Sequence, residues 1–180
     1  MAMEKDILKV LLTREEIKEI AERLGKEISE DYKDKKLLLV SVLKGAVVFM
    51  SDLMREITCE CEIDFMAISS YSGAKSTGAV QFKKDLDIDP HGYDILIVED
   101  ILDTGLSLKY VSDILKTKKA NSVKICAFLD KPENRKADIK ADYIGAVVPN
   151  EFVVGYGLDY NEHYRNLPYL GVLKPEVYGG

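Results

Sequence analysis

The sequence has few of the side chains that hold zinc or build a disulfide framework. Its 180 residues include three cysteines and two histidines, and only Cys59 and Cys61 stand close together. A structural zinc site needs four such ligands at short spacings, so a zinc-finger protein is excluded. An odd number of cysteines in a chain with no secretory signal predicts reduced thiols and a cytoplasmic location. We expect all three cysteines to be small, buried apolar residues.

A surplus of basic charge and a long apolar run are also missing. The chain carries 25 Lys and Arg against 31 Asp and Glu, which gives a formal net charge of −6. Nucleic-acid binders usually show a basic surplus or a dense basic stripe, so we expect no nucleic-acid partner. No segment approaches the ~20 apolar residues that a membrane-spanning helix requires. Residues 1–12 carry acidic side chains and only a short apolar run, so we expect neither a signal peptide nor a membrane anchor there.

What is present is an alternation of predicted helices and strands. Thr13 and Glu16 form a capping box that opens the first helix, and apolar residues recur at helical spacing after it. Continuous apolar runs, as in residues 37–42, are typical of strands buried on both faces. The sequence predicts helices over residues 13–30, 46–57 and 106–118, and strands over residues 37–42, 62–70, 79–85, 94–98, 122–129 and 143–148. For helix 106–118 the expected apolar stripe is Leu106, Tyr110, Ile114 and Leu115.

This order of elements predicts an α/β fold, with a central, mostly parallel sheet flanked by helices. The length fits a single domain over residues 1–180. The small polar segment 72–78 lies between two predicted strands and is expected to be a mobile loop. Ligands of such folds bind at the carboxyl ends of the strands. Three loops leave those ends with chemically active side chains, at Lys44, at residues 99–107 and at Lys131.

The loop after strand 94–98 carries the most informative pattern, Glu-Asp-Ile-Leu-Asp-Thr-Gly-Leu-Ser over residues 99–107. Two carboxylates at the end of an apolar strand cost desolvation free energy unless a cation or hydrogen-bond donors offset it. Glu99 and Asp100 suit vicinal ribose hydroxyls or Mg²⁺. The helix that begins next exposes free N–H groups, which suit a phosphate. Gly105 lets the backbone approach closely, and the Thr104 and Ser107 hydroxyls can add hydrogen bonds.

A purely structural role, or a different phosphate-binding motif, accounts for this loop less well. Asp-Thr-Gly before a helix fits a structural cap and turn as well as it fits a binding site. The Glu99-Asp100 pair is harder to explain as structure alone. Phosphoacceptor receiver domains also place acidic pairs at strand ends, but they lack the Thr-Gly-x-Ser turn that follows here. The Walker pattern G-x-x-x-x-G-K-[ST] is absent. The residues alone therefore predict a site for a phosphorylated ribose and a metal.

Residues 98–105 closely resemble the phosphoribosyl-pyrophosphate motif of type I phosphoribosyltransferases. Four further segments resemble the hypoxanthine (hypoxanthine-guanine) branch of that family, of bacterial type. They are residues 42–46 (its pyrophosphate loop), 69–71 (its lid), 129–132 (its purine-recognising lysine segment) and 152–160 (its strongest signature). The resemblance runs from about residue 40 to residue 174, which is most of the chain.

The resemblance implies that a 6-oxopurine displaces pyrophosphate from 5-phosphoribosyl pyrophosphate, with Mg²⁺ as cofactor. It implies the following roles for the sugar, the phosphate and the proton. Glu99 and Asp100 hold the ribose hydroxyls and a metal, Asp103 is the general base near N7 of the purine, and Asp103, Thr104, Gly105, Leu106 and Ser107 cradle the 5-phosphate.

It implies the remaining roles as well. Lys131 donates to the 6-oxo group, Phe152 stacks on the base, the Val153 backbone reads the edge of the base, and Asp159 ligates a second Mg²⁺. Lys44, Gly45 and Arg165 hold the pyrophosphate, and Ser70 and Tyr71 close over it. These roles suit the chemistry, since cations stabilise the charge that grows on pyrophosphate and a lid excludes water. A lysine also favours a 6-oxo group over the donor amino group of adenine.

The same resemblance implies a core over about residues 36–148, a small hood formed by residues 1–12 and 149–180, and a mobile lid loop. The apolar helix 46–57 and the resemblance together suggest a homodimer or homotetramer. Glu151 stands where many relatives carry lysine, which bears on the preference among hypoxanthine, guanine and xanthine. Two alternatives stay open: a regulator that keeps this fold but binds nucleic acid, and a phosphoribosyltransferase that uses another base.

Overall fold

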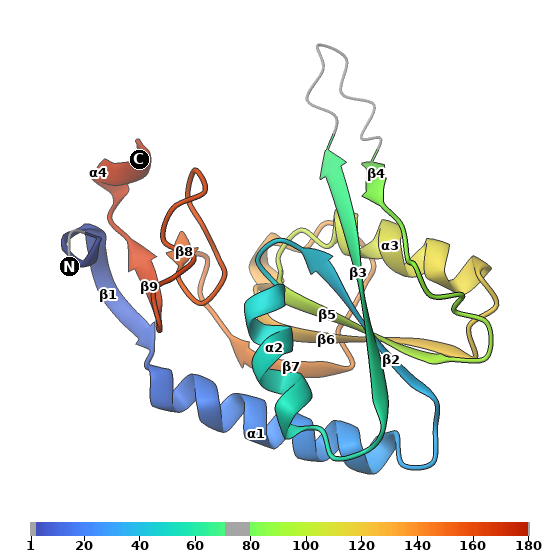
Figure 1. Cartoon of the computed structure of the whole chain (residues 1–180). Coiled ribbons are helices and arrows are strands. Elements are labelled where there is room, and N and C mark those ends of the chain that lie inside the picture. The colour runs from blue at the N-terminus through green and yellow to red at the C-terminus, as the bar shows by residue number, and fades with distance from the viewer. Residues whose placement is uncertain (1–2, 71–79, 180) are drawn as a thin grey trace.

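The computed structural model of the chain describes residues 3–70 and 80–179 (Figure 1). The predicted lid falls largely outside this range, since Tyr71 and the polar segment 72–78 lie outside the described residues. Among the described residues, no helix has the length and apolar character needed to cross a membrane.

Six strands form the main sheet, in the order β4-β3-β2-β5-β6-β7. They are β2 (Leu37–Leu43), β3 (Cys61–Ser70), β4 (Val80–Lys84), β5 (Asp94–Leu102), β6 (Ser122–Asp130) and β7 (Tyr143–Val147). Five of them run parallel, and only β4 pairs antiparallel, with β3. The predicted α/β class with a mostly parallel sheet is confirmed.

Helices cover both faces of this sheet (Figure 1). The helices α1 (Arg14–Asp31) and α2 (Val47–Glu56) lie on one face, and α3 (Leu106–Thr117) lies on the other. The strands supply both cores alternately: Leu37 and Leu39 of β2 pack on the α1 and α2 side, whereas Leu38 and Val40 pack on the α3 side. This burial on both faces explains why the strands are continuous apolar runs.

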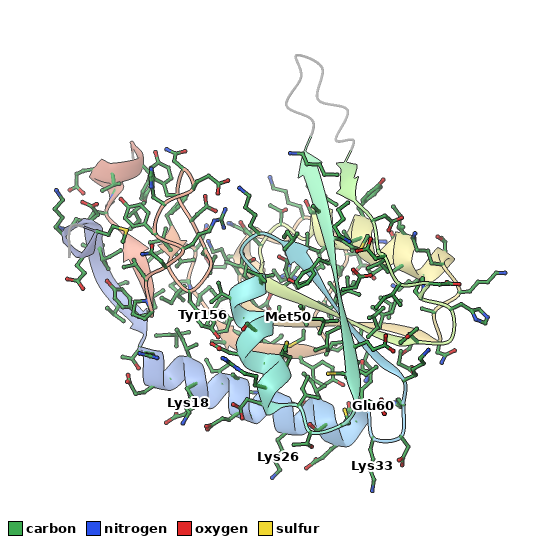
Figure 2. All side chains as sticks on the ribbon, in the orientation of Figure 1. Lys18, Lys26, Lys33, Met50, Glu60 and Tyr156 are labelled. Carbon is green, nitrogen blue, oxygen red and sulfur yellow. The ribbon has the colours of Figure 1, made fainter. Side chains whose placement is uncertain are left out.

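The helix α1 begins as predicted. The Thr13 hydroxyl accepts a hydrogen bond from the Glu16 N–H at 3.2 Å, and the Glu16 carboxylate accepts one from the Thr13 N–H at 2.7 Å. Both halves of the capping box are therefore formed. Lys18 and Lys26 point away from the sheet (Figure 2), which matches the expected charged outer face.

The buried face of α3 differs from the predicted stripe. Leu108, Val111 and Leu115 are buried, whereas Leu106, at the first helical position, is 56% exposed. Of the predicted stripe only Leu115 is fully buried. The cysteines also differ in part, since Cys126 is buried but Cys59 and Cys61 are only partly covered, and all three are free thiols.

A second, three-stranded sheet combines the two ends of the chain. It contains β1 (Ile7–Leu12), β9 (Leu170–Leu173) and β8 (Val153–Val154), in the antiparallel order β1-β9-β8. Figure 1 shows it standing apart from the main sheet. The remaining elements are short: the 3₁₀ helices η1 (Glu4–Asp6) and η2 (Pro132–Asn134), and the helix α4 (Pro175–Tyr178). The strands β1, β8 and β9 were not among those predicted from the sequence.

Candidate active site

A cleft of about 340 Å³ lies at the carboxyl ends of β2 and β5. The loop after β2, the loop between β5 and α3, and two residues of the segment 159–165 line it. The predicted site residues in its lining are Lys44, Gly45, Glu99, Asp100, Asp103, Thr104, Gly105, Ser107, Asp159 and Arg165. The fold therefore gathers most of the predicted site from three separate parts of the chain.

A second cleft, of about 420 Å³, adjoins the first. Its lining includes Lys131, Phe152 and Val153, the three residues predicted to contact a base. Asp103 and Asp159 line both clefts. A ligand that spans the two clefts would therefore pass directly beside these two carboxylates.

Three predicted site residues are not placed in either cleft. The Leu106 side chain is largely exposed and lines neither of them. Ser70 ends β3, but its side chain and the whole of Tyr71 lie outside the described part of the chain. The role of these two residues as a lid stays a prediction.

The paired carboxylates Glu99 and Asp100 have unusual electrostatics. Burial, and then the negative charge of Asp100, hold the pKa of Glu99 well above its usual value. Burial also raises the pKa of Asp100, although hydrogen bonds and the positive charge of Arg165 lower it in part. In the described part of the chain, neither carboxylate forms an ion pair with Lys or Arg. The pair is therefore suited to a cation that would offset its charge.

The protein alone does not enclose a metal here. Among residues 3–70 and 80–179, no three Asp, Glu, His or Cys side chains lie close enough together to hold an ion. Asp159, the third predicted metal ligand, instead pairs with Arg165, at 2.8 Å between Oδ1 and Nη2. An ion at this cleft would need further oxygen ligands from water or from a bound molecule, which is usual for Mg²⁺.

Asp103 lies where the two clefts meet. Its Oδ1 atom is buried and has no hydrogen-bond partner among residues 3–70 and 80–179. A buried carboxylate oxygen without a partner is costly and so uncommon in folded proteins, and it often marks a catalytic or ligand-binding group. Asp103 can therefore accept a proton or a hydrogen bond from a ligand in either cleft.

Gly105 shapes the loop that leads into α3. Its φ angle is +78°, in the left-handed region that glycine adopts readily. A Cβ atom here would also lie 2.6 Å from Ile139 Cγ2, so any residue other than glycine at position 105 would force Ile139 or the loop to move. The loop can therefore fold tightly over the start of α3, where backbone N–H groups and the helix dipole favour an anion.

Gly45 sits against the acidic pair. A Cβ atom at this position would overlap the Asp100 carboxylate and lie 3.1 Å from the Gly157 carbonyl oxygen. Only glycine leaves room for the loop after β2 to pass between them. This close approach is how residues 44 and 45 reach the first cleft.

An ion-pair network joins three of the residues that line the first cleft, Lys44, Asp159 and Arg165. Glu162 pairs with Lys44 at 3.0 Å and with Arg165 at 3.2 Å. Arg165 also pairs with Asp159 and donates a hydrogen bond to the Gly157 carbonyl at 2.8 Å. The two cations predicted to hold pyrophosphate therefore share one carboxylate. A bound anion would compete with Glu162 for both of them.

Lys131 is held in the second cleft by the backbone. Only 7% of it is exposed, and its Nζ donates a hydrogen bond to the Glu151 carbonyl oxygen at 2.8 Å. The Glu151 carboxylate instead pairs with Lys9 of β1 at 2.9 Å. Glu151 thus contacts the base-facing lysine through its backbone and not through its side chain.

Phe152 presents an aromatic ring to the second cleft. Its ring stacks on Tyr178 with 4.9 Å between centroids and meets Tyr160 edge-on at 5.6 Å. The ring is 38% exposed, which is unusual for a large aromatic side chain and leaves surface for a ligand. Val153, the next residue, is buried in β8.

Tyr156 ties this part of the chain to α2. Its hydroxyl donates a hydrogen bond to Asp52 Oδ2 at 2.6 Å, and its ring packs on Phe128 with 5.0 Å between centroids. In Figure 2 it lies beside α2, near Met50. The segment 155–159, which follows β8, is therefore anchored to the main sheet and its helices.

The structure adds three residues that the sequence analysis did not single out. They are Glu162, which links Lys44 to Arg165, Tyr178, which stacks on Phe152, and Arg135, which hydrogen-bonds to the backbone beside Asp103. Arg135 follows Lys131 closely in the sequence, and this nearness is the only signal that pointed to it.

Comparison with known proteins identifies a family. Residues 9–161 match the model of the phosphoribosyl transferase domain. A protein of Staphylococcus epidermidis named hypoxanthine-guanine phosphoribosyltransferase is 54% identical over 177 residues, which cover 98% of this chain and 99% of the relative.

Solved structures give the same result. A hypoxanthine phosphoribosyltransferase from Staphylococcus aureus superposes with a TM-score of 0.96 at 52% identity, over 100% of this chain and 98% of that one. A hypoxanthine-guanine phosphoribosyltransferase from Bacillus anthracis superposes with a TM-score of 0.87 at 39% identity, over 93% of this chain and 98% of that one.

Proposed function

Because this chain belongs to the phosphoribosyl transferase family, we propose that it transfers the 5-phosphoribosyl group from phosphoribosyl pyrophosphate to hypoxanthine, and also to guanine. The products are IMP or GMP and pyrophosphate. One observation carries the proposal: two adjoining clefts, one acidic and one aromatic, share Asp103. The first suits a sugar phosphate and the second suits a purine, and the reacting atoms of both would meet at Asp103.

The sugar phosphate occupies the first cleft in this proposal. Glu99 and Asp100 accept hydrogen bonds from the ribose hydroxyls, while the loop from Thr104 to Ser107 binds the 5-phosphate. The tight turn at Gly105 and the start of α3 support this role, since free N–H groups and the helix dipole favour an anion there.

The purine occupies the second cleft. Phe152 stacks on its ring, the Val153 backbone reads its edge, and Lys131 donates to the 6-oxo group. The hydrogen bond from Lys131 to a carbonyl oxygen supports this role, because a 6-oxo group offers the same kind of acceptor. Adenine would place a donor against a donor, which costs far more than a lost contact.

Transfer moves one bond and one proton. N9 of the purine forms a bond to C1 of the ribose while the bond from C1 to the pyrophosphate oxygen breaks with its electron pair. The proton on N7 passes to Asp103, whose buried Oδ1 has no partner among the described residues. A carboxylate near the reacting atoms also stabilises positive charge that develops on the sugar.

The residues present fit Mg²⁺ as cofactor. Glu99 and Asp100 would hold one ion and Asp159 a second, with the substrates supplying the other ligands. The raised pKa values of the acidic pair support this, because an uncompensated pair of carboxylates gains from a cation. When bound, the ion neutralises charge on the departing pyrophosphate.

The pyrophosphate lies against Lys44, the Gly45 backbone and Arg165 in this proposal, and Ser70 and Tyr71 close over it. The two cations are supported by their position at one cleft and by their shared partner, Glu162. Closure of a lid would exclude the water that hydrolyses the activated sugar.

Oligomeric state and location complete the proposal. We propose a homodimer or homotetramer, since Val47 and Met54 on α2 and Ile63 on β3 remain exposed. Light scattering coupled to gel filtration would give the mass directly. We also propose a cytoplasmic location, because three free cysteines suit a reducing compartment.

The test is a panel of bases assayed with phosphoribosyl pyrophosphate, with and without Mg²⁺. We expect Mg²⁺-dependent formation of IMP from hypoxanthine and GMP from guanine, and no product from adenine. No turnover with hypoxanthine, guanine or xanthine would overturn the proposal. A pyrimidine product would assign the chain to another branch of the family, and tight, salt-sensitive RNA or DNA binding without turnover would indicate a regulator.

A further inference from the structure

We propose that Arg135 is a positioning residue of the active site, which fixes the backbone at Asp103 and couples it to the loop that carries Lys131. The inference rests on the proposed function and adds a residue that lines neither cleft. Arg135 contacts the backbone of the catalytic loop, at Leu102 and Asp103, without lining a cleft itself.

The Arg135 guanidinium makes four contacts, three with backbone carbonyls and one with a carboxylate. Its Nε donates to the Asp103 carbonyl at 2.9 Å, and Nη2 donates to the Leu102 carbonyl at 3.0 Å. Its Nη1 donates to the Ile139 carbonyl at 3.0 Å, and Nη2 also pairs with the Asp130 carboxylate. The side chain is only 17% exposed, and that of Asp130 only 13%. Such charge-assisted bonds are strong where water is largely excluded.

The residues after Arg135 extend this contact along the loop. The N–H groups of Lys136 and Ala137 both donate to the Thr104 carbonyl, at 2.9 and 3.1 Å. The carbonyls of Leu102, Asp103 and Thr104 are therefore all bound from the same side. Three successive carbonyls held in this way leave the loop little freedom to shift.

The orientation of these carbonyls determines what the loop offers to a ligand. In a trans peptide the C=O of one residue and the N–H of the next point in opposite directions. The N–H groups of Thr104 and Gly105 therefore point away from Arg135. In the described part of the chain neither donates a hydrogen bond, so both are available to an anion.

Arg135 also connects the two clefts. Lys131 donates its backbone N–H to the Leu102 carbonyl at 3.0 Å, and this is the carbonyl that Arg135 Nη2 contacts. Asp130, the ion-pair partner of Arg135, directly precedes Lys131. The residue that reads the base and the residue that takes the proton are thus fixed to one side chain.

Arginine is specifically required for this arrangement. Guanidinium presents five donors in a rigid plane, whereas the lysine ammonium is a compact point charge on a flexible stem. Lys at position 135 could keep the ion pair with Asp130 but could not reach three carbonyls at fixed angles. We therefore expect Arg135→Lys to preserve the fold and still impair catalysis.

The experiment compares Arg135→Lys and Arg135→Ala with Arg23→Ala. Arg23 is a matched control, because its guanidinium donates to two backbone carbonyls, Ile144 at 3.1 Å and Gly145 at 2.8 Å, and none of these three residues lines either cleft. We expect kcat to fall roughly 100-fold in Arg135→Ala, since a displacement of about 1 Å has that effect. The KM for phosphoribosyl pyrophosphate should rise, and Arg23→Ala should leave both constants unchanged.

Two further readouts separate positioning from general stability. The pH profile of kcat/KM should shift in both Arg135 variants, because a displaced Asp103 meets a different environment. Added methylguanidinium should restore part of the activity of Arg135→Ala and none to Arg135→Lys, where the ammonium occupies the site. Kinetic constants and a pH profile that match Arg23→Ala would overturn the proposal, and where Arg135→Ala does not fold, Arg135→Lys decides.

Amide hydrogen exchange makes the result independent of turnover. We expect faster exchange at the amides of Lys131, Lys136 and Ala137, which donate to the Leu102 and Thr104 carbonyls, in the Arg135 variants than in wild type or Arg23→Ala. Should wild type transfer no phosphoribosyl group at all, the proposed function fails, yet faster exchange confined to these amides would still support the positioning role. Unchanged exchange at these amides would overturn that role whether or not the enzyme is active.

Discussion

The ammonium of Lys131 donates a hydrogen bond to the backbone carbonyl of Glu151 at a distance of 2.8 Å. Lys131 is almost fully buried, so this acceptor satisfies a charge that would otherwise be costly. A 6-oxopurine that binds Lys131 exchanges one carbonyl-type acceptor for another. Adenine offers no such acceptor, so its binding would leave the lysine facing a donor.

Replacing Lys131 by Met should therefore impair base recognition and spare the sugar. We expect the KM for hypoxanthine to rise about 10- to 100-fold, since a hydrogen bond to a charged group contributes about 1.5–3 kcal/mol. The KM for phosphoribosyl pyrophosphate should stay near that of wild type. Rejection of adenine should weaken, and steady-state kinetics with both bases measure these effects. Lys116→Met, on the exposed side of α3, is the control, and unchanged kinetics in both variants would contradict the role of Lys131.

Replacing Asp103 by Asn should slow the chemical step. The amide keeps the size of the carboxylate but cannot take a proton, so we expect kcat to fall about 10²- to 10⁴-fold. Binding of phosphoribosyl pyrophosphate with Mg²⁺, measured by calorimetry, should change little. Asp113→Asn, on the exposed surface of α3, controls for loss of charge. An equal loss of sugar-phosphate affinity would instead make Asp103 a ligand-holding residue.

Replacing Gly45 by Ala should abolish activity through a steric conflict. The added Cβ would overlap the Asp100 carboxylate, so either the loop or the acidic pair must move. Gly92→Ala is the control: Gly92 has φ +81°, and apart from its two chain neighbours no described residue has an atom within 4 Å of an added Cβ. It should cost about 1–2 kcal/mol of stability through its backbone conformation alone. Thermal unfolding and kcat/KM would be measured for both, and an active Gly45→Ala enzyme would argue against the close packing.

Replacing Glu99 by Gln should stabilise the protein in the absence of Mg²⁺ and impair catalysis. The pKa of Glu99 is raised by burial and by the charge of Asp100, so the folded state binds this proton more tightly than the unfolded state. The free energy of unfolding therefore falls as pH rises from the usual carboxyl pKa through the raised one. The variant lacks this loss, so its Tm should exceed that of wild type at high pH and approach it at low pH.

Melting curves from roughly pH 4 to pH 8, around and above the usual carboxyl pKa, would show the two Tm values converging as pH falls. Added Mg²⁺ and phosphoribosyl pyrophosphate should raise the Tm of wild type more than that of the variant, because a ligand stabilises the state that it binds. Glu133→Gln, at an exposed position, should behave like wild type. A Glu99→Gln protein that melts below wild type at neutral pH would contradict the inferred cost of burying the charged Glu99 carboxylate.

The fold was predictable where a strand is buried on both faces or where a local motif marks the start of a helix. The strands β2 and β5 are continuous apolar runs because both faces of the sheet are covered, and the capping box at Thr13 fixed the start of α1. The face of α3 was not predictable in the same way. Apolar residues surround much of this helix, and only contact with the sheet decides that Val111 is buried and Leu106 is not.

The second sheet was missed for a related reason. Its strand β8 has two residues, too few for a periodic pattern. Pairing of β1 with β9 joins Ile7 to Leu173, across nearly the whole chain, and no local pattern names that partner. The partial exposure of Cys59 and Cys61 was not predicted either, since they lie just before and at the start of β3, and no local pattern shows how far other elements cover the end of a strand.

The site was predictable as far as its motifs are contiguous. The acidic loop, the Lys131 segment and the Phe152 segment each carry a local pattern, so their residues could be named and the fold brings most of them together. Arg135 and Glu162 act through contacts with distant segments. Their importance depends on geometry that spacing along the chain does not encode.

The strand order β1-β9-β8 also determines when the second sheet can form during translation. Phe152 and Val153 are placed by β8, whose described ladder partner is β9, at residues 170–173. A ribosome extends a chain from its amino end at about 5–20 residues per second. All six strands of the main sheet are synthesised before β9. The strand β1 is synthesised first, but it cannot pair until β9, the last strand, has been made. A nascent chain would therefore hold the loop 99–107, which is proposed to bind the sugar phosphate, before pairing with β9 could fix Phe152 and Val153 beside a base.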